Sequence, residues 1–380
     1  MNPRALRFRG PVYGSSGYAS AAREFVLALE KLQRIEISLD PLKWLSGFDV
    51  QESRERWLRL RRLELVPPDP QGRLLHWTVA PEYQGRDGFA SAIGHTIFES
   101  NSLPRSFVEG CNRMDAIMVP SAFHVEAFRR AGVAVPLQVI PEGVDTERFN
   151  PEGPRLTSLP QRFTFLWVAQ LSYRKGFDLV LKAFLELFAE HDDVQLVMRT
   201  YLRDGSAQDL DQVAELIRLF REEELGGIKR GHVYLLDNVA DVHLPALYRS
   251  SQVLLAPFRG EGWGLPMIEA LASEVPVIAT GWGGPLSYLN PNNATLLNYQ
   301  LRPIPAQIPK LFLAGVLEQA RAEGHLLAEP DYQQLKYAMW DAYQNYFTHK
   351  AKAVQARDQL QAGFRWEHAA HKFADWIETL

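Results

Sequence analysis

Short apolar runs and amphipathic segments alternate along almost the whole chain. The apolar runs, which we interpret as strands, are Leu74–Ala80, Ser91–Phe98, Ala116–Pro120, Leu137–Pro141, Phe163–Ala169, Val194–Arg199, His232–Leu236, Gln252–Pro257 and Pro276–Thr280. The segments with helical periodicity are Ala19–Leu32, Pro104–Met114, Ser121–Ala131, Gly176–Glu190, Asp209–Glu224, Leu244–Ser250, Leu265–Ser273, Asp331–Tyr346 and Phe364–Leu380. Because parallel strands need crossover connections, this alternation predicts parallel α/β sheets with helices on both faces.

A proline-rich segment divides this pattern in two. Asn150–Pro160 contains Pro151, Pro154 and Pro160 and interrupts the periodicity, which suits a linker. The chain has 380 residues, which is long for one core and comfortable for two domains. We therefore predict a first domain over residues 1–153 and a second over residues 154–363, with a final helical segment over 364–380.

The composition is that of a globular protein and excludes several classes. Hydrophobic residues make up 46% of the chain and charged residues 23%, which excludes a disordered chain. The net charge of −4 argues against a surface that binds nucleic acid, so no nucleic-acid partner is expected. Cys111 is the only cysteine, which excludes an internal disulfide. Met1–Gly10 lacks the apolar run of a signal peptide and no stretch reaches 18 apolar residues, so we expect a cytoplasmic location.

The most informative stretch is Phe258–Ala272, directly after the apolar run Gln252–Pro257. It holds three glycines at alternate positions, which allow the backbone to approach a ligand closely: Gly260, Gly262 and Gly264. Pro266 suits the first turn of the helix that follows. The loop therefore directs free N–H groups and the positive end of a helix dipole to one place, which favours an anion such as a diphosphate.

Two carboxylates flank this glycine loop. Glu261 lies before the helix, and Glu269 lies within it on the face of Leu265. Carboxylate oxygens accept hydrogen bonds from hydroxyl groups, so the pair suits a ligand that carries both an anion and hydroxyls. Such a ligand is a nucleotide sugar. The alternative interpretation is a glycine turn with two solvated glutamates.

At these residues the sequence resembles glycosyltransferase family 4, the retaining enzymes of the GT-B fold, which carry a Glu-x7-Glu pair in this context. Four further segments resemble that family: Phe98–Pro104, Val119–Phe123, Pro141–Phe149 and Lys175–Phe184. The resemblance covers essentially the whole chain. It implies two Rossmann-like domains that face each other across a cleft, with the C-terminal helix crossing back to the N-terminal domain. It also implies retaining transfer of a sugar from a nucleotide-sugar donor to an acceptor hydroxyl, in glycan or glycolipid synthesis.

The resemblance assigns roles on the donor side. Lys175 would bind the donor diphosphate together with an arginine, Glu261 would hold sugar hydroxyls, and Glu269 would hold the ribose. The usual Gly-Arg pair of the family is replaced here by Ala169 and Gln170, so Arg174 or Arg199 is the candidate second cation. The predicted donor-binding residues are Gly14, Gly17, Arg174, Lys175, Glu261, Gly262, Trp263, Gly264, Leu265 and Glu269.

Two loops extend this prediction. The Gly-rich turn Gly14–Tyr18 precedes the helical segment Ala19–Leu32, and in the resembled family this loop faces the donor phosphates and the acceptor. Trp282–Pro285 follows the strand Pro276–Thr280, at the end where open α/β sheets bind ligands. The family often has a glutamate soon after this second loop, where Ser287 and Tyr288 lie here. Ordinary tight turns are the alternative interpretation of both loops.

The family's catalytic histidine has no direct counterpart at the expected register. Glu99 follows the predicted strand Ile93–Phe98 at that register, and it can accept hydrogen bonds from sugar hydroxyls. We predict Glu99, Glu261 and Lys175 as the catalytic residues. His95, which is equally consistent with a packed core histidine, and His76 are the alternative candidates.

No essential metal or other cofactor is predicted. Asp209 and Asp211 match an Asp-x-Asp metal pattern, but they open a helical segment, where acidic residues complement the helix dipole. The histidines lack zinc-ligand spacing. The amides of Gly262–Leu265 and the Lys175 cation would stabilise the leaving diphosphate instead.

A basic segment in the first half of the chain bears on membrane contact and on the class of acceptor. Arg54–Leu65 is a basic amphipathic segment, which is typical either of a solvated helix face or of peripheral contact with the inner face of an anionic membrane. The acceptor is therefore expected to be a saccharide or a glycolipid. Two alternatives to a transferase remain: a sugar-nucleotide epimerase of the same architecture, and a non-catalytic protein that binds nucleotide sugars.

Overall fold

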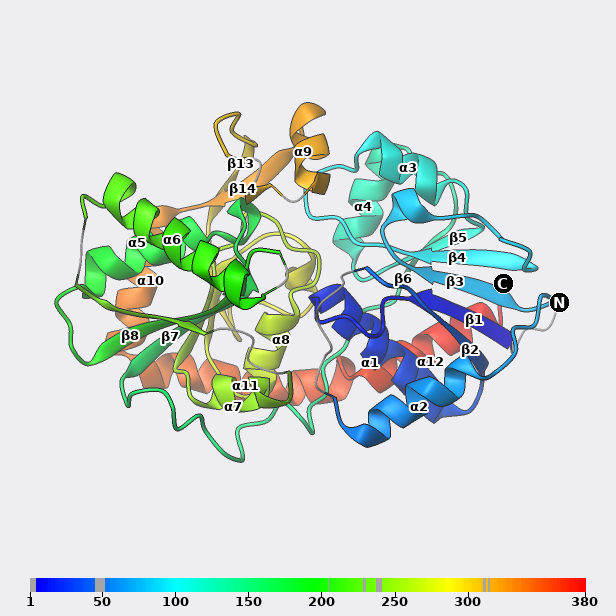
Figure 1. Cartoon of the computed structure of the whole chain (residues 1–380), viewed down its shortest axis with the longest axis horizontal. Coiled ribbons are helices and arrows are strands. Elements are labelled where there is room, and N and C mark those ends of the chain that lie inside the picture. The colour runs from blue at the N-terminus through cyan, green and yellow to red at the C-terminus, as the bar shows by residue number, and fades with distance from the viewer. Residues whose placement is uncertain are drawn as a thin grey trace. The chain divides into compact units, whose positions relative to one another are not determined.

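The computed structural model describes residues 5–44, 52–203, 205–227, 230–236, 241–309, 312–313 and 315–380. These form two compact units, which Figure 1 shows in colours that run along the chain. The N-terminal unit comprises Met1–Asp145 and Ala362–Leu380, and the C-terminal unit comprises Thr146–Gln361. The division after Asp145 falls shortly before Asn150–Pro160, where the sequence predicts the linker.

The N-terminal unit is built on a six-stranded parallel sheet of order β2-β1-β3-β4-β5-β6. Its strands are β1 (Ala5–Gly10), β2 (Glu36–Pro41), β3 (Arg73–Trp77), β4 (Ser91–His95), β5 (Ala116–Val119) and β6 (Leu137–Val139). Its helices are α1 (Gly17–Leu32), α2 (Arg54–Glu64), the 3-10 turn η1 (Ala80–Glu82), α3 (Arg105–Cys111), α4 (Ala122–Ala131) and α12 (Trp366–Ile377).

The last helix of the chain belongs to this first unit. Helix α12 lies beside α1, and the Phe25 and Phe373 rings meet edge to face with centroids 5.4 Å apart (Figure 1). Lys31 also pairs with Glu367 at 3.1 Å. The backbone of Val144 pairs with that of Arg365 just before the helix begins. The predicted return of the C-terminal helix to the N-terminal domain is therefore confirmed.

The C-terminal unit is built on a second six-stranded parallel sheet, of order β12-β11-β10-β7-β8-β9. Its strands are β7 (Phe163–Gln170), β8 (Val194–Tyr201), β9 (His232–Leu236), β10 (Val253–Ala256), β11 (Val277–Thr280) and β12 (Thr295–Leu297), with an antiparallel hairpin of β13 (Tyr299–Pro303) and β14 (Leu326–Pro330). Its helices are the 3-10 turn η2 (Tyr173–Lys175), α5 (Phe177–Phe188), α6 (Ala207–Glu224), η3 (Asp241–His243), α7 (Leu244–Arg249), α8 (Leu265–Ala272), η4 (Gly284–Ser287), α9 (Gly315–Ala322), α10 (Tyr332–Gln344) and α11 (Tyr346–Gly363).

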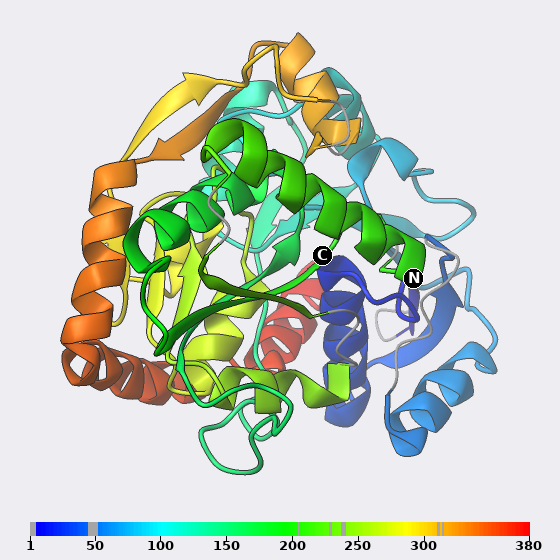
Figure 2. The same ribbon diagram turned by 60° about the vertical axis from the view of Figure 1, so that its left-hand side comes forward.

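The core of this unit lies between the sheet and its helices. Fully buried aromatic side chains such as Phe165, Trp167 and Phe184 come from β7 and α5. Figure 2 shows α10 (orange) and α11 (dark red) meeting at a sharp bend. The two parallel sheets with their helices confirm the predicted fold class of two Rossmann-like domains.

Two predicted strands end earlier than the apolar runs suggest. Strand β3 stops at Trp77 and β4 stops at His95, instead of continuing to Ala80 and Phe98. The pairing of β3 with β4 ends at Trp77 and His95, and β5 also pairs no further than His95. Apolar residues beyond this point, such as Phe98, are buried without strand pairing. Hydrophobicity therefore marks the buried segment and does not mark where strand pairing stops.

No helix among the described residues has the length and apolar character needed to cross a membrane.

Candidate functional site

The glycine loop of the C-terminal unit has the local structure that the sequence predicts. Gly264 adopts a left-handed conformation (φ 85°) and caps the N-terminus of α8. Because a side chain is strained at this φ whatever the space around it, glycine is favoured here. The first N–H groups of a helix have no partner within it, and Pro266 has no N–H. The amides of Gly264 and Leu265 therefore direct the positive end of the α8 dipole toward the loop.

Lys175, Arg174 and Glu261 meet at this loop. Lys175 Nζ forms an ion pair with Glu261, and Arg174 Nη1 donates to the Gly260 carbonyl at 2.8 Å. Glu261 is only 9% exposed. Burial alone would raise the pKa of Glu261, but the charges of Lys175 and Arg174 hold it below its ordinary value. The site is therefore an ionised carboxylate between two cations, next to a helix N-terminus.

The loop that follows β11 contacts the backbone of Glu261. The Gly284 amide donates to the Glu261 carbonyl at 3.1 Å. Gly283 has φ 86°, and a β-carbon there would lie 2.6 Å from that same carbonyl oxygen. The Tyr288 hydroxyl bridges the carbonyls of Trp263 (2.8 Å) and Gly264 (2.9 Å). Trp282–Pro285 and Tyr288 therefore support the backbone of the glycine loop.

Glu269 lies in a second polar group on the same unit. The Tyr248 hydroxyl donates to Glu269 Oε2 at 2.7 Å. Burial, and next the charge of Glu269, raise the pKa of Tyr248, while the charge of Arg199 opposes this shift. The charge of Arg199 therefore acts on Tyr248. Of the two arginines considered for the second phosphate contact, Arg174 is the one whose charge acts on Glu261.

We expect Glu269→Ala to weaken nucleotide binding by about 1–3 kcal/mol, because the ribose hydroxyls would lose their acceptor. The buried Tyr248 hydroxyl would lose its acceptor too, which lowers the stability of the fold. Glu269→Gln keeps an acceptor oxygen and should lose less. Calorimetric titration of the folded variants with a nucleoside diphosphate measures this difference. Equal affinity of wild type and Glu269→Ala would remove the ribose assignment.

The sequence interpretation missed Arg259, which lies two residues before Glu261. Its side chain is 3% exposed and binds Asp178 and Glu329. No local signal could have singled it out, because both of its partners lie far away along the chain.

The predicted glycines of the first loop lie in the N-terminal unit. Gly17 is the first residue of α1, and the Ser16 hydroxyl caps that helix by accepting from the Ala19 amide at 3.2 Å. The buried Arg23 donates to the carbonyls of Val12 (2.9 Å) and Gly14 (3.0 Å). This loop is therefore held in a fixed shape at the N-terminus of α1.

The structure places His95 and Glu99 differently from the sequence prediction. His95 is the last residue of β4, and Glu99 is half-buried four positions beyond it, so Glu99 does not directly follow the strand. The Tyr18 hydroxyl donates to the His95 carbonyl at 3.0 Å. The pKa of Tyr18 is raised chiefly by burial and further by the carboxylates of Glu142 and Glu99. Tyr18 and Glu142 therefore lie next to His95, and the charge of Glu99 acts on Tyr18.

Both candidate histidines are buried. His95 is 0% exposed and packs against Trp77, with ring centroids 3.7 Å apart and ring planes tilted by 34°. His95 Nε2 lies 3.6 Å from Glu142 Oε1, which is beyond hydrogen-bond distance. Burial, and next the charge of His124, lower the pKa of His95 to about 3. Burial likewise lowers the pKa of His76 to about 4. Both imidazoles are therefore neutral at neutral pH.

This burial predicts that acid weakens the fold. The unfolded chain protonates His95 near its ordinary pKa of 6.5, whereas the folded chain resists protonation until about 3. The unfolded state therefore gains protons first, and stability falls as the pH drops from about 7 toward 3. We expect His95 to lower the free energy of unfolding by about 1–2 kcal/mol between pH 7 and pH 5. Denaturant unfolding at the two pH values measures this loss. The free energy of unfolding of His95→Gln should change less between pH 7 and pH 5 than that of wild type, and an equal change in both proteins would contradict the assignment.

The features that the sequence analysis set aside have structural partners. Asp209 is buried and accepts from the amides of Leu202 (2.8 Å) and Gly205 (3.0 Å), whereas Asp211 is exposed. Asp209 therefore holds the loop before α6, a stronger role than complementing the dipole. No group of three or more His, Cys, Asp or Glu side chains that suits a metal ion occurs in the part of the chain that the structure describes.

The basic segment is the helix α2, and its arginines are largely paired within the N-terminal unit. Arg56 pairs with Glu24, Arg59 with Glu30, and Arg61 with Glu64. These carboxylates neutralise much of the positive charge that a membrane surface would attract, which favours the solvated-face interpretation.

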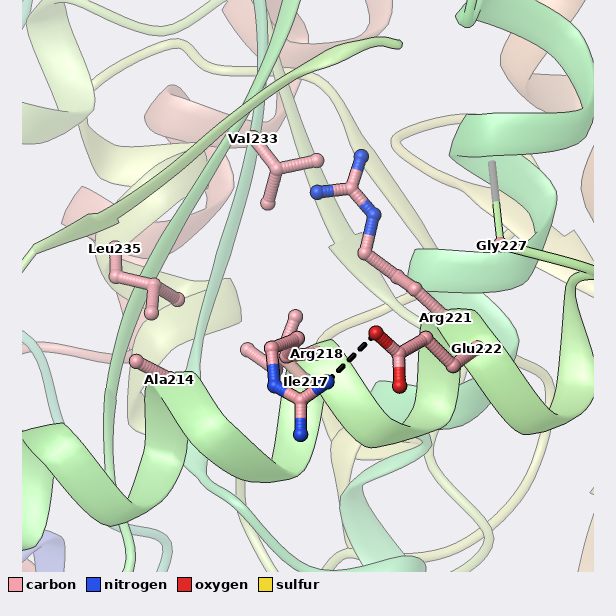
Figure 3. A pocket seen from close by; sticks show the side chains of 8 residues that line it. All are labelled: Ala214, Ile217, Arg218, Arg221, Glu222, Gly227, Val233 and Leu235. Carbon is pink, nitrogen blue, oxygen red and sulfur yellow. Dashed lines mark hydrogen bonds and ion pairs between the residues drawn. The ribbon is translucent and has the colours of Figure 1, made fainter. Parts of the chain in front are cut away.

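A hollow of about 380 Å³ lies elsewhere on the C-terminal unit, between α6 and β9 (Figure 3). It is lined by apolar side chains such as Ile217, Val233 and Leu235, with Arg218 at its edge paired to Glu222 at 2.6 Å. None of the predicted site residues lines it. This hollow is therefore separate from the group formed by Lys175, Arg174 and Glu261.

Comparisons with known proteins point to one family. Residues 162–302 match the family model described as "Glycosyl transferases group 1". The chain is 30% identical over 178 residues to the lipopolysaccharide core biosynthesis mannosyltransferase LpcC of Rhizobium leguminosarum bv. viciae, covering 45% of this chain and 46% of the relative. It is 29% identical over 184 residues to the GDP-mannose-dependent alpha-(1-6)-phosphatidylinositol monomannoside mannosyltransferase of Mycobacterium tuberculosis, covering 45% of each chain. The matched region thus spans less than half the length of these relatives.

Solved structures share the fold over the whole chain. Sucrose-phosphate synthase from Thermosynechococcus elongatus matches with a TM-score of 0.66 and 15% identity, over 99% of this chain and 98% of that one. HepE of Anabaena in complex with UDP and glucose matches with a TM-score of 0.67 and 14% identity, over 99% and 100%. The matched residues 162–302, the mannosyltransferase relatives and the shared fold together confirm the resemblance of this chain to glycosyltransferase family 4.

Proposed function

We propose that this protein is a retaining, metal-independent glycosyltransferase that moves a hexosyl group from a nucleotide sugar to an acceptor hydroxyl. The observation that carries the proposal is the convergence of Lys175, Arg174 and Glu261 on the N-terminal end of α8. Two cations and a helix N-terminus suit a diphosphate, and a carboxylate beside them suits the hydroxyls of a sugar. These residues all lie within the matched region 162–302.

In this proposal the diphosphate is both leaving group and base. The bond between the sugar's anomeric carbon and the diphosphate oxygen breaks, and the acceptor oxygen bonds to the same face of that carbon. The acceptor proton passes to the departing diphosphate oxygen. Lys175, Arg174 and the amides at the start of α8 stabilise the negative charge that develops on the diphosphate. Glu261 exchanges its contact with Lys175 for contacts with sugar hydroxyls when the donor binds.

The relatives suggest which donor to try first. The two curated proteins compared above at about 30% identity are mannosyltransferases, and one is described as GDP-mannose-dependent. A third relative, 29% identical over 154 residues, is the mannosylfructose-phosphate synthase of Agrobacterium fabrum, whose name also refers to a mannosyl group. We therefore propose mannosyl transfer from GDP-mannose as the first reaction to test, with UDP-glucose as the second. The acceptor is a saccharide or a glycolipid.

Incubation with a panel of nucleotide sugars tests the proposal without knowledge of the acceptor. A transferase slowly hydrolyses its own donor, so free sugar and nucleoside diphosphate should accumulate with one member of the panel. An epimerase would instead return an isomerised nucleotide sugar. A non-catalytic binding protein would bind a donor and leave it intact. Either of these two results would overturn the proposal.

We expect activity to persist in excess EDTA, because Lys175, Arg174 and the α8 amides supply the positive charge that a divalent ion would otherwise provide. The measurement is donor cleavage with and without chelator. Complete loss that manganese restores would show that the reaction needs a metal, and it would bring Asp209 and Asp211 back into consideration.

A further inference from the structure

Arg259 uses its entire hydrogen-bonding capacity inside the C-terminal unit. Its Nη1 donates to the Tyr173 carbonyl (2.8 Å) and to Asp178 Oδ1 (2.8 Å). Its Nη2 donates to Asp178 Oδ2 (2.7 Å) and Glu329 Oε1 (3.0 Å), and its Nε donates to Glu329 Oε2 (2.5 Å). These five bonds match the five N–H donors of a guanidinium, and both carboxylates are held in two-pronged contacts.

The rest of the residue is fixed as well. The guanidinium lies over the Tyr173 ring, 3.8 Å from its centroid. The Arg259 amide donates to the Arg174 carbonyl at 2.7 Å, and the Arg259 carbonyl accepts from the Ala328 amide at 2.8 Å. Burial would lower the pKa of Arg259, but the ion pairs with Asp178 and Glu329 raise it above its ordinary value. The side chain is therefore charged and held by contacts on every side.

These contacts join three segments that are distant in the sequence. They link the 3-10 turn η2, which carries Arg174 and Lys175, to the loop that carries Glu261 and to the strand β14. Without Arg259, the carboxylates of Asp178 and Glu329 would face each other with no cation between them. The phosphate-binding cations of the proposed function thus sit on a turn whose backbone is held by Arg259.

We infer that Arg259, with Asp178 and Glu329, is a positioning device that sets Arg174 and Lys175 for the diphosphate of the donor. This inference rests on the proposed function. Glu269, which would hold the ribose, is supported separately by Tyr248 on α7. Disturbing Arg259 should therefore weaken contacts to phosphate and leave contacts to the nucleoside intact.

The test compares two classes of ligand, nucleoside diphosphates and nucleosides, on three variants. Arg259→Lys keeps the charge but cannot form two two-pronged contacts. Glu329→Gln removes one carboxylate while keeping the shape of the side chain. It tests the same inference if Arg259→Lys does not fold. Arg218→Lys is the matched control, because Arg218 also binds two carboxylates but lies on the exposed face of α6. UDP, GDP and ADP and their nucleosides are titrated, and binding is followed by ligand-observed NMR and calorimetry.

We expect Arg259→Lys and Glu329→Gln to lose affinity for the bound nucleoside diphosphate by about 10-fold or more, with nucleoside affinity unchanged. Arg218→Lys should match wild type for both ligands. The inference would be overturned if the variants lost equal affinity for diphosphate and nucleoside, or lost affinity for neither. In that case the proposed function would still stand, as long as wild type binds a nucleoside diphosphate. If wild type binds none of the three diphosphates, the proposed function fails and the inference fails with it.

Discussion

Replacing Lys175 by Met should lower kcat for donor cleavage by about 10²–10³-fold, which is the effect of removing one group that stabilises charge in a transition state. Lys175 is the cation that contacts Glu261 at the start of α8, so it lies where the diphosphate would gain negative charge. Arg174 remains in the variant and continues to bind the substrate. The loss should therefore appear more strongly in kcat than in the affinity for nucleoside diphosphate.

Two further variants separate chemistry from folding. Lys175→Met leaves the buried Glu261 with one fewer positive neighbour, which destabilises the fold. The double variant Lys175→Met/Glu261→Gln removes both charges and should recover stability while staying inactive. Lys336→Met, which breaks the ion pair with Glu186 on the same unit, should leave activity unchanged. Near wild-type turnover by a folded Lys175→Met would show that this lysine does not stabilise the leaving group.

Glu99→Gln should lower kcat by about 10²-fold or more, the scale of a positioned acid or base. The resemblance to family 4 assigns a catalytic group to this register, and the charge of Glu99 acts on Tyr18, whose hydroxyl contacts the His95 carbonyl. Glutamine keeps the volume of the side chain and removes its charge. Because Glu99 is half-buried, the thermal midpoint of unfolding should hardly change.

His95 is the alternative catalytic candidate to Glu99. His95 occupies the end of β4, whereas Glu99 lies beyond it in irregular backbone. If Glu99→Gln turns over at nearly the wild-type rate, His95 becomes the better candidate, and His95→Gln should then show the large loss. The low pKa of His95 means that its protonation would not shape the pH–rate profile between pH 5 and 8.

The local structure of the glycine loop was predictable because it follows local rules. A buried strand, alternate glycines, a proline at the helix start and two glutamates predict the loop, and Gly264 takes the left-handed conformation that only glycine adopts easily. Lys175 and Arg174 come from a segment more than 80 positions away. Their meeting with Glu261 depends on β7 pairing beside β10, which the sequence implies only through the family resemblance.

Other features depend on tertiary contacts that no local pattern reports. Arg259 reads as a surface residue in the sequence, because its partners Asp178 and Glu329 lie far away along the chain. Helix α11 lacks a strong apolar face, since its buried positions include small residues such as Ala353 and Ala356. Strands β3 and β4 end together at Trp77 and His95, before the apolar runs stop.

The most direct test of the proposed glycosyl transfer is donor cleavage by wild type and Lys175→Met, measured side by side on a panel that includes GDP-mannose and UDP-glucose. NMR of the reaction mixtures identifies every product. The account predicts that wild type releases free sugar and nucleoside diphosphate from one donor, and that Lys175→Met does so at least about 10²-fold more slowly. A wild-type protein that leaves every donor intact, or that returns only an isomerised nucleotide sugar, would contradict it.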